Sequence, residues 1–125
     1  MTENDISFKV RGAIYEIYNE LGAGLLESVY IAALEYELKR QGLSVKRELP
    51  LPVVYKEVKL ELGFRLDLLV EEKVIVEIKS VEKLAAVHHK QVLTYLKLTK
   101  LKLGILVNFN VSNIREGIFR KVNGL

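Results

Sequence analysis

The segment FRLDLLVEEKVIVEIKS, residues 64–80, constrains the fold more than any other part of the chain. It contains two runs of large apolar residues separated by the charged triplet at 71–73, which is typical of two strands joined by a tight loop. An antiparallel hairpin with this three-residue loop places Leu68 opposite Val76. The chain is therefore expected to fold around a β-sheet.

The same hairpin brings two carboxylates together. Asp67 faces Glu77, and Lys79 lies on the same face two residues further along, because side chains alternate along a strand. The apolar residues that alternate with them point to the opposite face, toward a core. A two-residue loop would instead put the two acids on opposite faces, and the loop contains no glycine that decides the register.

A paired Asp67 and Glu77 indicate a possible metal site. Like charges directly opposite one another are destabilising and raise a carboxyl pKa unless a cation intervenes. Two carboxylates, a backbone carbonyl such as that of Ile78, and water are the oxygen ligands that Mg²⁺ or Mn²⁺ prefers. The amine of Lys79 is then available to activate a water or to offset charge on a phosphate. The alternative is a salt-bridged strand face exposed to solvent.

The rest of the chain alternates between helical and extended patterns. Apolar residues step by three and four along helices, and short β-branched runs indicate strands. The predicted elements are helices over 6–21 and 25–41, an edge strand within 44–62 with a turn near Lys56 and Glu57, strands over 63–70 and 73–79, a helix over 82–99 and a buried strand over 101–109. The last dozen residues are ambiguous between strand and helix. This order predicts an α/β domain with one mixed sheet covered by helices.

Two of the predicted helices carry polar groups on otherwise apolar stripes. Glu27 lies on the stripe that continues through Ile31, Leu34 and Leu38, so a carboxylate is expected to point inward near the start of that helix. A buried glutamate needs a partner. The simpler interpretation is an acid stabilised by the helix macrodipole.

The third helix shows the same feature. His88, Gln91 and Tyr95 fall at steps of three and four, in line with Leu84 and Leu98. Taken alone, such residues are more often satisfied core or boundary residues than catalytic ones, and His89 is expected to be exposed. Three elements that each aim polar groups inward nevertheless favour a shared site.

Composition limits the classes of protein that remain. A chain of 125 residues, 50% of them hydrophobic, suits a single domain over 1–125. The absence of cysteine excludes a disulfide framework, a thiolate metal site and a cysteine nucleophile. A net charge of +3 permits a polyanionic partner. The polar N-terminus and the short apolar runs predict a soluble, cytoplasmic protein with no membrane segment.

The motifs together resemble a known family. The stretch GLLESVY carries Gly24, Glu27 and Tyr30 in the spacing of the GxxExxY family, which is assigned to the PD-(D/E)xK nuclease superfamily. RLDLLV, VIVEIKS, HHKQVLTYLK and LGILVNF resemble later blocks of that family in order and spacing, so the likeness covers nearly the whole chain. It implies a restriction-endonuclease-like core, in which a central mixed β-sheet is flanked by α-helices.

The resemblance also implies roles for individual residues. Asp67 would be the metal-binding aspartate, with Glu77 and Lys79 as the E and K of the ExK strand, and Glu27 would complete the metal shell directly or through water. The proline of the superfamily label is replaced by Leu66, a position that carries no ligand.

On the third helix, Gln91 and Tyr95 match the QxxxY pattern of RecB-like nucleases, which helps to place the nucleic acid. His88 has no metal-ligand role in the pattern. A contact with a phosphate, or a bond that supports the acids, is the most that the resemblance suggests for it.

The expected function is therefore hydrolysis of phosphodiester bonds in nucleic acid by a divalent-metal-dependent nuclease. DNA is favoured over RNA, with branched DNA as the leading case. A homodimer is expected because small resolvases of the same superfamily are basic dimers of similar length. The candidates for gripping phosphates are Arg40, Lys46, Arg47, Lys83, Lys90, Lys97, Lys100 and Lys102. The alternative is a nucleic-acid-binding or assembly subunit that keeps the fold without turnover. An enzyme acting on a small phosphate is less favoured, because no Gly-rich phosphate loop is present.

Overall fold

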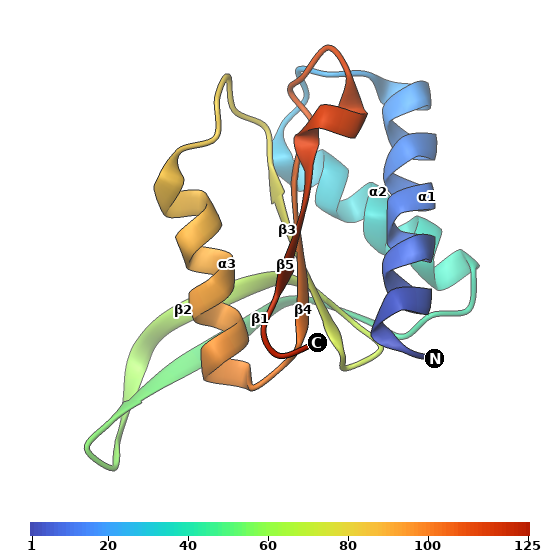
Figure 1. The fold of residues 1–125 in the computed structure, drawn as a ribbon. Helices are drawn as coiled ribbons and strands as arrows, with labels where there is room; N and C mark the ends of the chain where they lie inside the picture. Colours follow the sequence, from blue (N-terminus) through green and yellow to red (C-terminus); the bar gives the residue numbers. More distant parts are fainter.

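The structure, a computed structural model, describes the backbone of all 125 residues and every side chain except those of Glu61 and Leu62. A five-stranded mixed sheet is covered by two helices on one face and by a third helix on the other (Figure 1). The predicted α/β class, with a central mixed sheet flanked by helices, is confirmed. No described helix is long and apolar enough to cross a membrane.

The elements follow the predicted order, with one addition at the C-terminus. They are α1 (Glu3–Leu21), α2 (Glu27–Arg40), β1 (Val45–Tyr55), β2 (Val58–Val70), β3 (Val74–Lys79), α3 (Ala86–Thr99), β4 (Leu103–Asn108), the 3₁₀ helix η1 (Ile114–Gly117) and β5 (Ile118–Val122). The ambiguous C-terminal segment thus holds both a short helix and a strand. The first two helices end close to the predicted residues, because Gly22 and Gly42 follow them with φ of 71° and 88°.

The strands lie in the order β1-β2-β3-β4-β5. Only β3 and β4 are parallel, and the other neighbouring strands are antiparallel. A parallel pair needs a crossover connection, which α3 supplies. The carboxyl ends of β3 and β4 therefore meet at the same edge of the sheet.

The predicted hairpin register between β2 and β3 is confirmed. Val70 pairs with Val74 and Leu68 pairs with Val76, around a three-residue loop. No glycine is needed there, because the loop residues Glu71 and Glu72 themselves adopt φ of 55° and 56°.

The two faces of the sheet bury two separate cores. The larger, against α1 and α2, includes Ile6, Ile14, Leu34, Leu38, Val76 and Ile78, and the smaller, against α3, consists of Leu66, Leu69, Ile75, Tyr95 and Leu96. The predicted apolar stripe of α2 is confirmed. For α3 the prediction was wrong at Leu98, which is 42% exposed, because the helix packs through Val92, Tyr95 and Leu96 instead.

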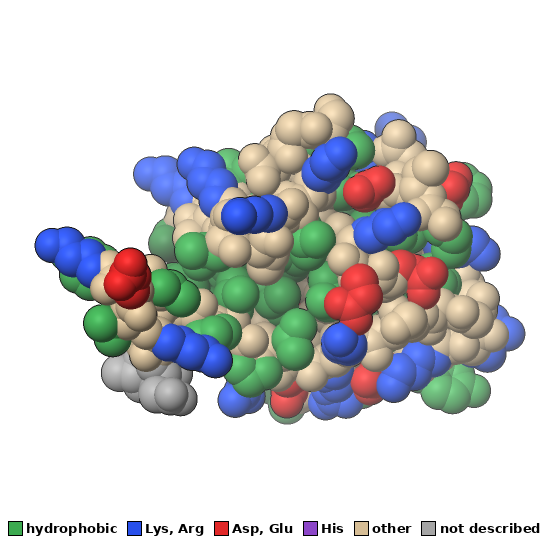
Figure 2. Space-filling model, turned by 90° about the horizontal axis from the view of Figure 1, so that it is seen from below, with side chains coloured by type: hydrophobic (Ala, Val, Ile, Leu, Met, Phe, Trp, Pro, Cys, Tyr) green, Lys and Arg blue, Asp and Glu red, His purple; other side chains and the backbone are tan. Residues whose placement is uncertain are grey.

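The β1–β2 hairpin projects from the body as a long arm (Figure 1). The predicted turn at Lys56 and Glu57 is confirmed, with φ of 47° and 69°. The second strand begins at Val58 rather than near residue 63, because the pairing with β1 continues to the turn. Seen from below, hydrophobic side chains gather where the arm meets the body, with lysine and arginine side chains around them (Figure 2).

Candidate active site

The acidic pair lies where β2 separates from β3. The last ladder pair is Leu68 with Val76, and Asp67 and Glu77 follow directly beyond it. The N–H of Asp67 donates to Oε2 of Glu77 at 2.8 Å, and the N–H of Ile78 donates to Oδ2 of Asp67 at 2.8 Å. Each carboxylate thus accepts a hydrogen bond from a main-chain N–H that has no partner in the β2–β3 ladder. The prediction that the two acids are neighbours is confirmed.

Each acid keeps one oxygen free. Oδ1 of Asp67 and Oε1 of Glu77 accept no hydrogen bond from the described residues. Every buried side-chain oxygen and nitrogen in the described part of the chain has a partner, so these two oxygens are reached by solvent. The N–H and C=O of a strand residue point to the same side, so the carbonyl of Ile78 faces the same opening. Three oxygens are therefore available to a ligand there.

The environment of the pair disfavours two negative charges. Burial, followed by the charge of Asp67, raises the pKa of Glu77 to about 8, against the opposing effect of Lys79. Burial also raises the pKa of Asp67, although the N–H of Ile78 and the charge of Lys79 oppose the shift. No described lysine or arginine forms an ion pair with either acid. The site is short of positive charge.

Lys79 is the last residue of β3 and is paired in the parallel ladder with Asn108 of β4. Its side chain is half-buried. Its charge lowers the pKa of both Asp67 and Glu77, which agrees with the predicted position of the amine beside the pair.

Glu27 is the first residue of α2, and its Oε2 accepts a hydrogen bond from the N–H of Ser80 at 3.1 Å. Its charge raises the pKa of Asp67 and of Glu77, so it lies near them. The structure does not bring it into a common cluster with them: among the described residues, no three His, Cys, Asp or Glu side chains could hold a metal ion together. The acid pair and the helix-borne acid are adjacent but separate.

Helix α3 brings Tyr95 to the site. Its side chain is 3% exposed and packs against the ring of Phe64, with ring centroids 5.1 Å apart. Burial, with smaller contributions from the charges of Glu77 and Asp67, raises the pKa of the Tyr95 hydroxyl to about 12. Gln91, one turn earlier, is half-buried.

The two histidines of α3 contact groups other than the acids. Nδ1 of His88 accepts from the N–H of Ala85 at 3.0 Å, so the ring caps the start of the helix, and no bond from it to the acids occurs among the described residues. His89 was expected to be exposed, but it is half-buried against Phe119, with ring centroids 4.9 Å apart. The prediction for His89 was wrong because α3 also packs against β5.

Sequence reasoning missed two polar residues at this edge of the sheet. Asn108 is 3% exposed, at the end of β4. Ser80 donates through Oγ to the carbonyl of Leu25 at 2.6 Å, which ties β3 to the loop before α2. The only available signal was an asparagine within the apolar run LGILVNF.

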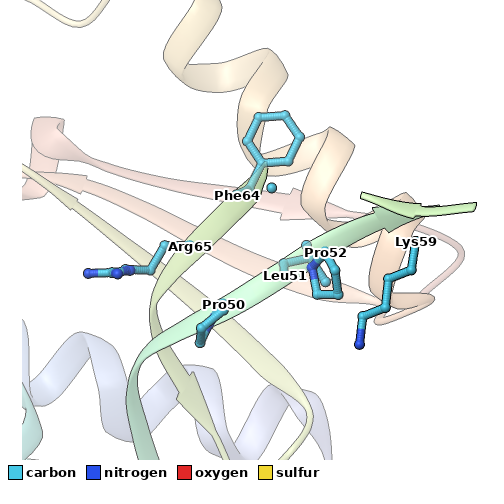
Figure 3. A pocket seen from close by; sticks show the side chains of 7 residues that line it. Pro50, Leu51, Pro52, Lys59, Phe64 and Arg65 are labelled. Carbon is cyan, nitrogen blue, oxygen red and sulfur yellow. The ribbon is translucent and has the colours of Figure 1, made fainter. Parts of the chain in front are cut away.

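Two hollows lie near these elements, besides one of about 280 Å³ that is lined in part by His89 and Asn108. One, of about 540 Å³, is lined by residues 24–28, Ser80 and Asn110, and it adjoins Glu27. The other, of about 410 Å³, is formed by the arm at residues 50–52, 59 and 63–65. In Figure 3, Phe64 points toward α3, whereas Pro50 and Lys59 point to the other side of the strands. Of Glu27, Asp67 and Glu77, none lines that second hollow, and only Glu27 lines the first.

The lysines and arginines that were predicted to bind phosphates divide into two groups. The three near α2 are engaged: Arg40 pairs with Glu37 at 2.7 Å, Lys46 with Glu72 at 2.5 Å and Arg47 with Glu35 at 3.4 Å. Those near α3 are exposed and form no ion pair with a described acid; they are Lys83, Lys90, Lys97, Lys100 and Lys102. Of the eight predicted cations, the five that form no ion pair with a described acid therefore lie on or next to α3, which covers the face of the sheet that carries Glu77.

Comparison with known proteins gives one match. The family model described as PD-(D/E)XK nuclease superfamily matches residues 4–121. No curated protein and no solved structure matches the chain significantly. The matched region contains Glu27, Asp67, Glu77, Lys79 and the residues of α3 described above.

Proposed function

The chain belongs to the PD-(D/E)XK nuclease superfamily, and on that premise we propose that it is a divalent-metal-dependent nuclease that hydrolyses phosphodiester bonds of nucleic acid. DNA is the favoured substrate, and branched or otherwise structured DNA is the leading case. We also propose that, within this superfamily, the chain is a member of the GxxExxY family.

One observation carries the proposal. The buried carboxylate of Glu77 and the half-buried carboxylate of Asp67 lie side by side with a free oxygen each, and neither forms an ion pair with a described lysine or arginine. Burying like charges is costly unless a cation compensates them. An arrangement of this kind is expected where the compensating charge comes from a ligand.

The residues fit a hard divalent cation. The free oxygens of Asp67 and Glu77 and the carbonyl of Ile78 are the donors that Mg²⁺ or Mn²⁺ prefers, with water in the remaining positions. Glu27 has one oxygen engaged with Ser80, so we propose that it contributes through a water. When bound, the cation supplies Lewis-acid stabilisation of phosphate charge and makes a hydroxide accessible near neutral pH.

The other residues bind and orient the substrate in this proposal. The amine of Lys79 holds a proton next to the reacting phosphate and offsets the charge that develops there. Gln91 and Tyr95 contact the nucleic acid from α3, and the ring nitrogen of His88 that does not cap the helix is available to a phosphate. The exposed lysines of α3 and its C-terminal end bind flanking phosphates.

We further propose that the chain acts as a homodimer. A single core of 125 residues offers little surface for a branched substrate, whereas two copies would present two sites.

The test is cleavage of labelled linear, flapped and four-way DNA, and of matching RNA, with Mg²⁺ or Mn²⁺. Asp67→Asn and Lys79→Ala should abolish cleavage while leaving the protein folded and nucleic-acid binding nearly unchanged. Lys39→Ala is the matched control, since Lys39 pairs on the surface with Glu35. Cleavage by Asp67→Asn at the wild-type rate would refute the proposal, and binding without turnover by the wild type would favour a non-catalytic subunit.

A further inference from the structure

A set of hydrogen bonds fixes the main chain directly after Lys79. The N–H of Val81 donates to Oδ1 of Asn108 at 3.1 Å, and Nδ2 of Asn108 donates to the carbonyl of Val81 at 2.9 Å. Oδ1 of Asn108 also accepts from the N–H of Asn110 at 3.2 Å. One buried amide therefore holds the exit of β3 and the exit of β4 together.

The side-chain amide of Asn108 can form all three of these hydrogen bonds at once. A side-chain amide offers a carbonyl oxygen and an NH₂ group, and here both are used by main-chain groups. Only one orientation of the Asn108 amide satisfies all three bonds, because Val81 presents an N–H and a carbonyl side by side. Aspartate, which has the same length, offers only acceptors when it is ionised, and leucine offers neither a donor nor an acceptor.

The end of β3 needs such support. From Glu77 onward β3 pairs in the ladder with β4 alone, because β2 pairs with β3 only through Leu68, Leu69 and Val70. Lys79 is the final residue of the strand. Its carbonyl accepts from the N–H of Phe109 at 3.0 Å, and Ser80 is bonded to Glu27 and Leu25, so the Asn108 bonds at Val81 complete the set that holds this strand end. Without a fixed main chain at Lys79 and Val81, its long and flexible side chain would not keep its amine beside the acids.

We propose that Asn108 is a positioning residue, which holds the main chain at Val81 and thereby directs the amine of Lys79 toward Asp67 and Glu77. The proposal rests on the proposed function, because it gives Asn108 a task in cleavage. Asn108 does not touch the acids itself: its described bonds go to main-chain groups alone. Its effect on the reaction passes through Lys79.

The first experiment measures the position of Lys79 without any substrate. Lysines are reductively ¹³C-methylated, and the Lys79 signal is assigned by its loss in Lys79→Arg. In the wild type the chemical shift of this signal should differ from that of exposed lysines, because the acids lie beside the amine. Asn108→Ala should shift the Lys79 signal to the chemical shift of exposed lysines. An unchanged chemical shift in a folded variant would overturn the proposal.

The second experiment measures turnover by unmethylated protein. Asn108→Ala should lower kcat by about 10- to 100-fold with KM nearly unchanged, because a displaced amine affects the reacting phosphate rather than overall binding. Asn123→Ala is the matched control: Asn123 also donates to main-chain carbonyls, those of Leu96 and Leu101, but at the opposite end of β4. A loss of the same size in both variants would indicate a general structural effect and refute the proposal.

Asn108→Asp covers the case in which the alanine variant does not fold. Aspartate keeps the acceptor for Val81 and Asn110 but loses the donor, so it should shift the Lys79 signal and lower kcat less than alanine would. A fully wild-type signal and rate in Asn108→Asp would overturn the proposal. Absence of cleavage by the wild type would refute the nuclease function, while the Lys79 signal would still decide whether Asn108 positions the amine.

Discussion

Strand β3 is buried on both faces, but the two faces contain different chemistry. On one face Val76 and Ile78 are fully buried in the large core against α1 and α2. On the other, Glu77 is 3% exposed beside Asp67, next to the smaller core under α3. Burial of apolar groups stabilises the fold, whereas burial of two acids without a cation opposes it. One face of β3 therefore stabilises the fold, and the other carries an acid that opposes it.

The largest predicted effect belongs to the apolar side. Leu34 of α2 is fully buried in the large core, so Leu34→Ala should lower the free energy of unfolding by about 2–5 kcal/mol through lost transfer energy and a cavity. Urea unfolding measures the change. Leu98→Ala is the control, because Leu98 is 42% exposed and should change stability by less than about 0.5 kcal/mol. Equal losses in the two variants would contradict the proposed division of the faces.

The acidic side should respond in the opposite direction. At pH 8 without divalent cations, Glu77→Gln should raise the free energy of unfolding by roughly 1–3 kcal/mol, since one pKa unit corresponds to about 1.4 kcal/mol. Glutamine keeps an acceptor for the N–H of Asp67. A destabilised Glu77→Gln protein at pH 8 would show that the charge of Glu77 supports the fold.

The pH dependence sharpens this comparison. The folded-state pKa of Glu77 is about 8, above the ordinary value of 4.5, so the folded protein holds the proton more tightly than the unfolded chain. The stabilisation from protonated Glu77 is complete below about pH 4.5 and is lost as the pH rises through about 8. The advantage of Glu77→Gln should therefore grow over this range and disappear at its acidic end. Thermal unfolding at stepwise pH values measures it, and a constant difference would contradict the assignment.

A smaller effect is expected where the large core meets the loop before α2. The Tyr30 hydroxyl donates to the carbonyl of Gly22 at 2.6 Å and accepts from the N–H of Leu25 at 3.2 Å. Tyr30→Phe keeps the stacking on Phe109 and removes both bonds, so it should cost about 1 kcal/mol. Urea unfolding measures this loss, and a loss as large as that of Leu34→Ala would mean that the hydroxyl does more than hold the loop.

The hairpin and its acids were predictable because local rules agree there. Once a three-residue loop is assumed, alternation of side chains places Leu68 opposite Val76, and the position of the acids follows from that register; the alternative two-residue loop could be set aside only with the structure. The stripe of α2 was predictable for the same reason. Helix periodicity fixes which residues share a face, and Leu34 and Leu38 are buried as expected.

The rest depends on long-range geometry. The carboxylate of Glu77 accepts from the N–H of Asp67, and that of Asp67 accepts from the N–H of Ile78, because β2 separates from β3 there. No local sequence pattern predicts this separation. Asn108 is hidden in an apolar run, and its partner at Val81 lies 27 residues earlier in the chain. His88 lay in line with Tyr95, but its place at the start of α3 made it a cap.

Calorimetric titration of Mn²⁺ into the wild type and into Asp67→Asn tests the central claim most directly. The account predicts that the wild type binds Mn²⁺, that Asp67→Asn binds it at least tenfold more weakly, and that binding releases protons near pH 7 because Glu77 must ionise. Lys39→Ala should bind like the wild type. Equal binding by the wild type and Asp67→Asn, or none by the wild type even with nucleic acid present, would contradict the claim that the buried acid pair is a metal site.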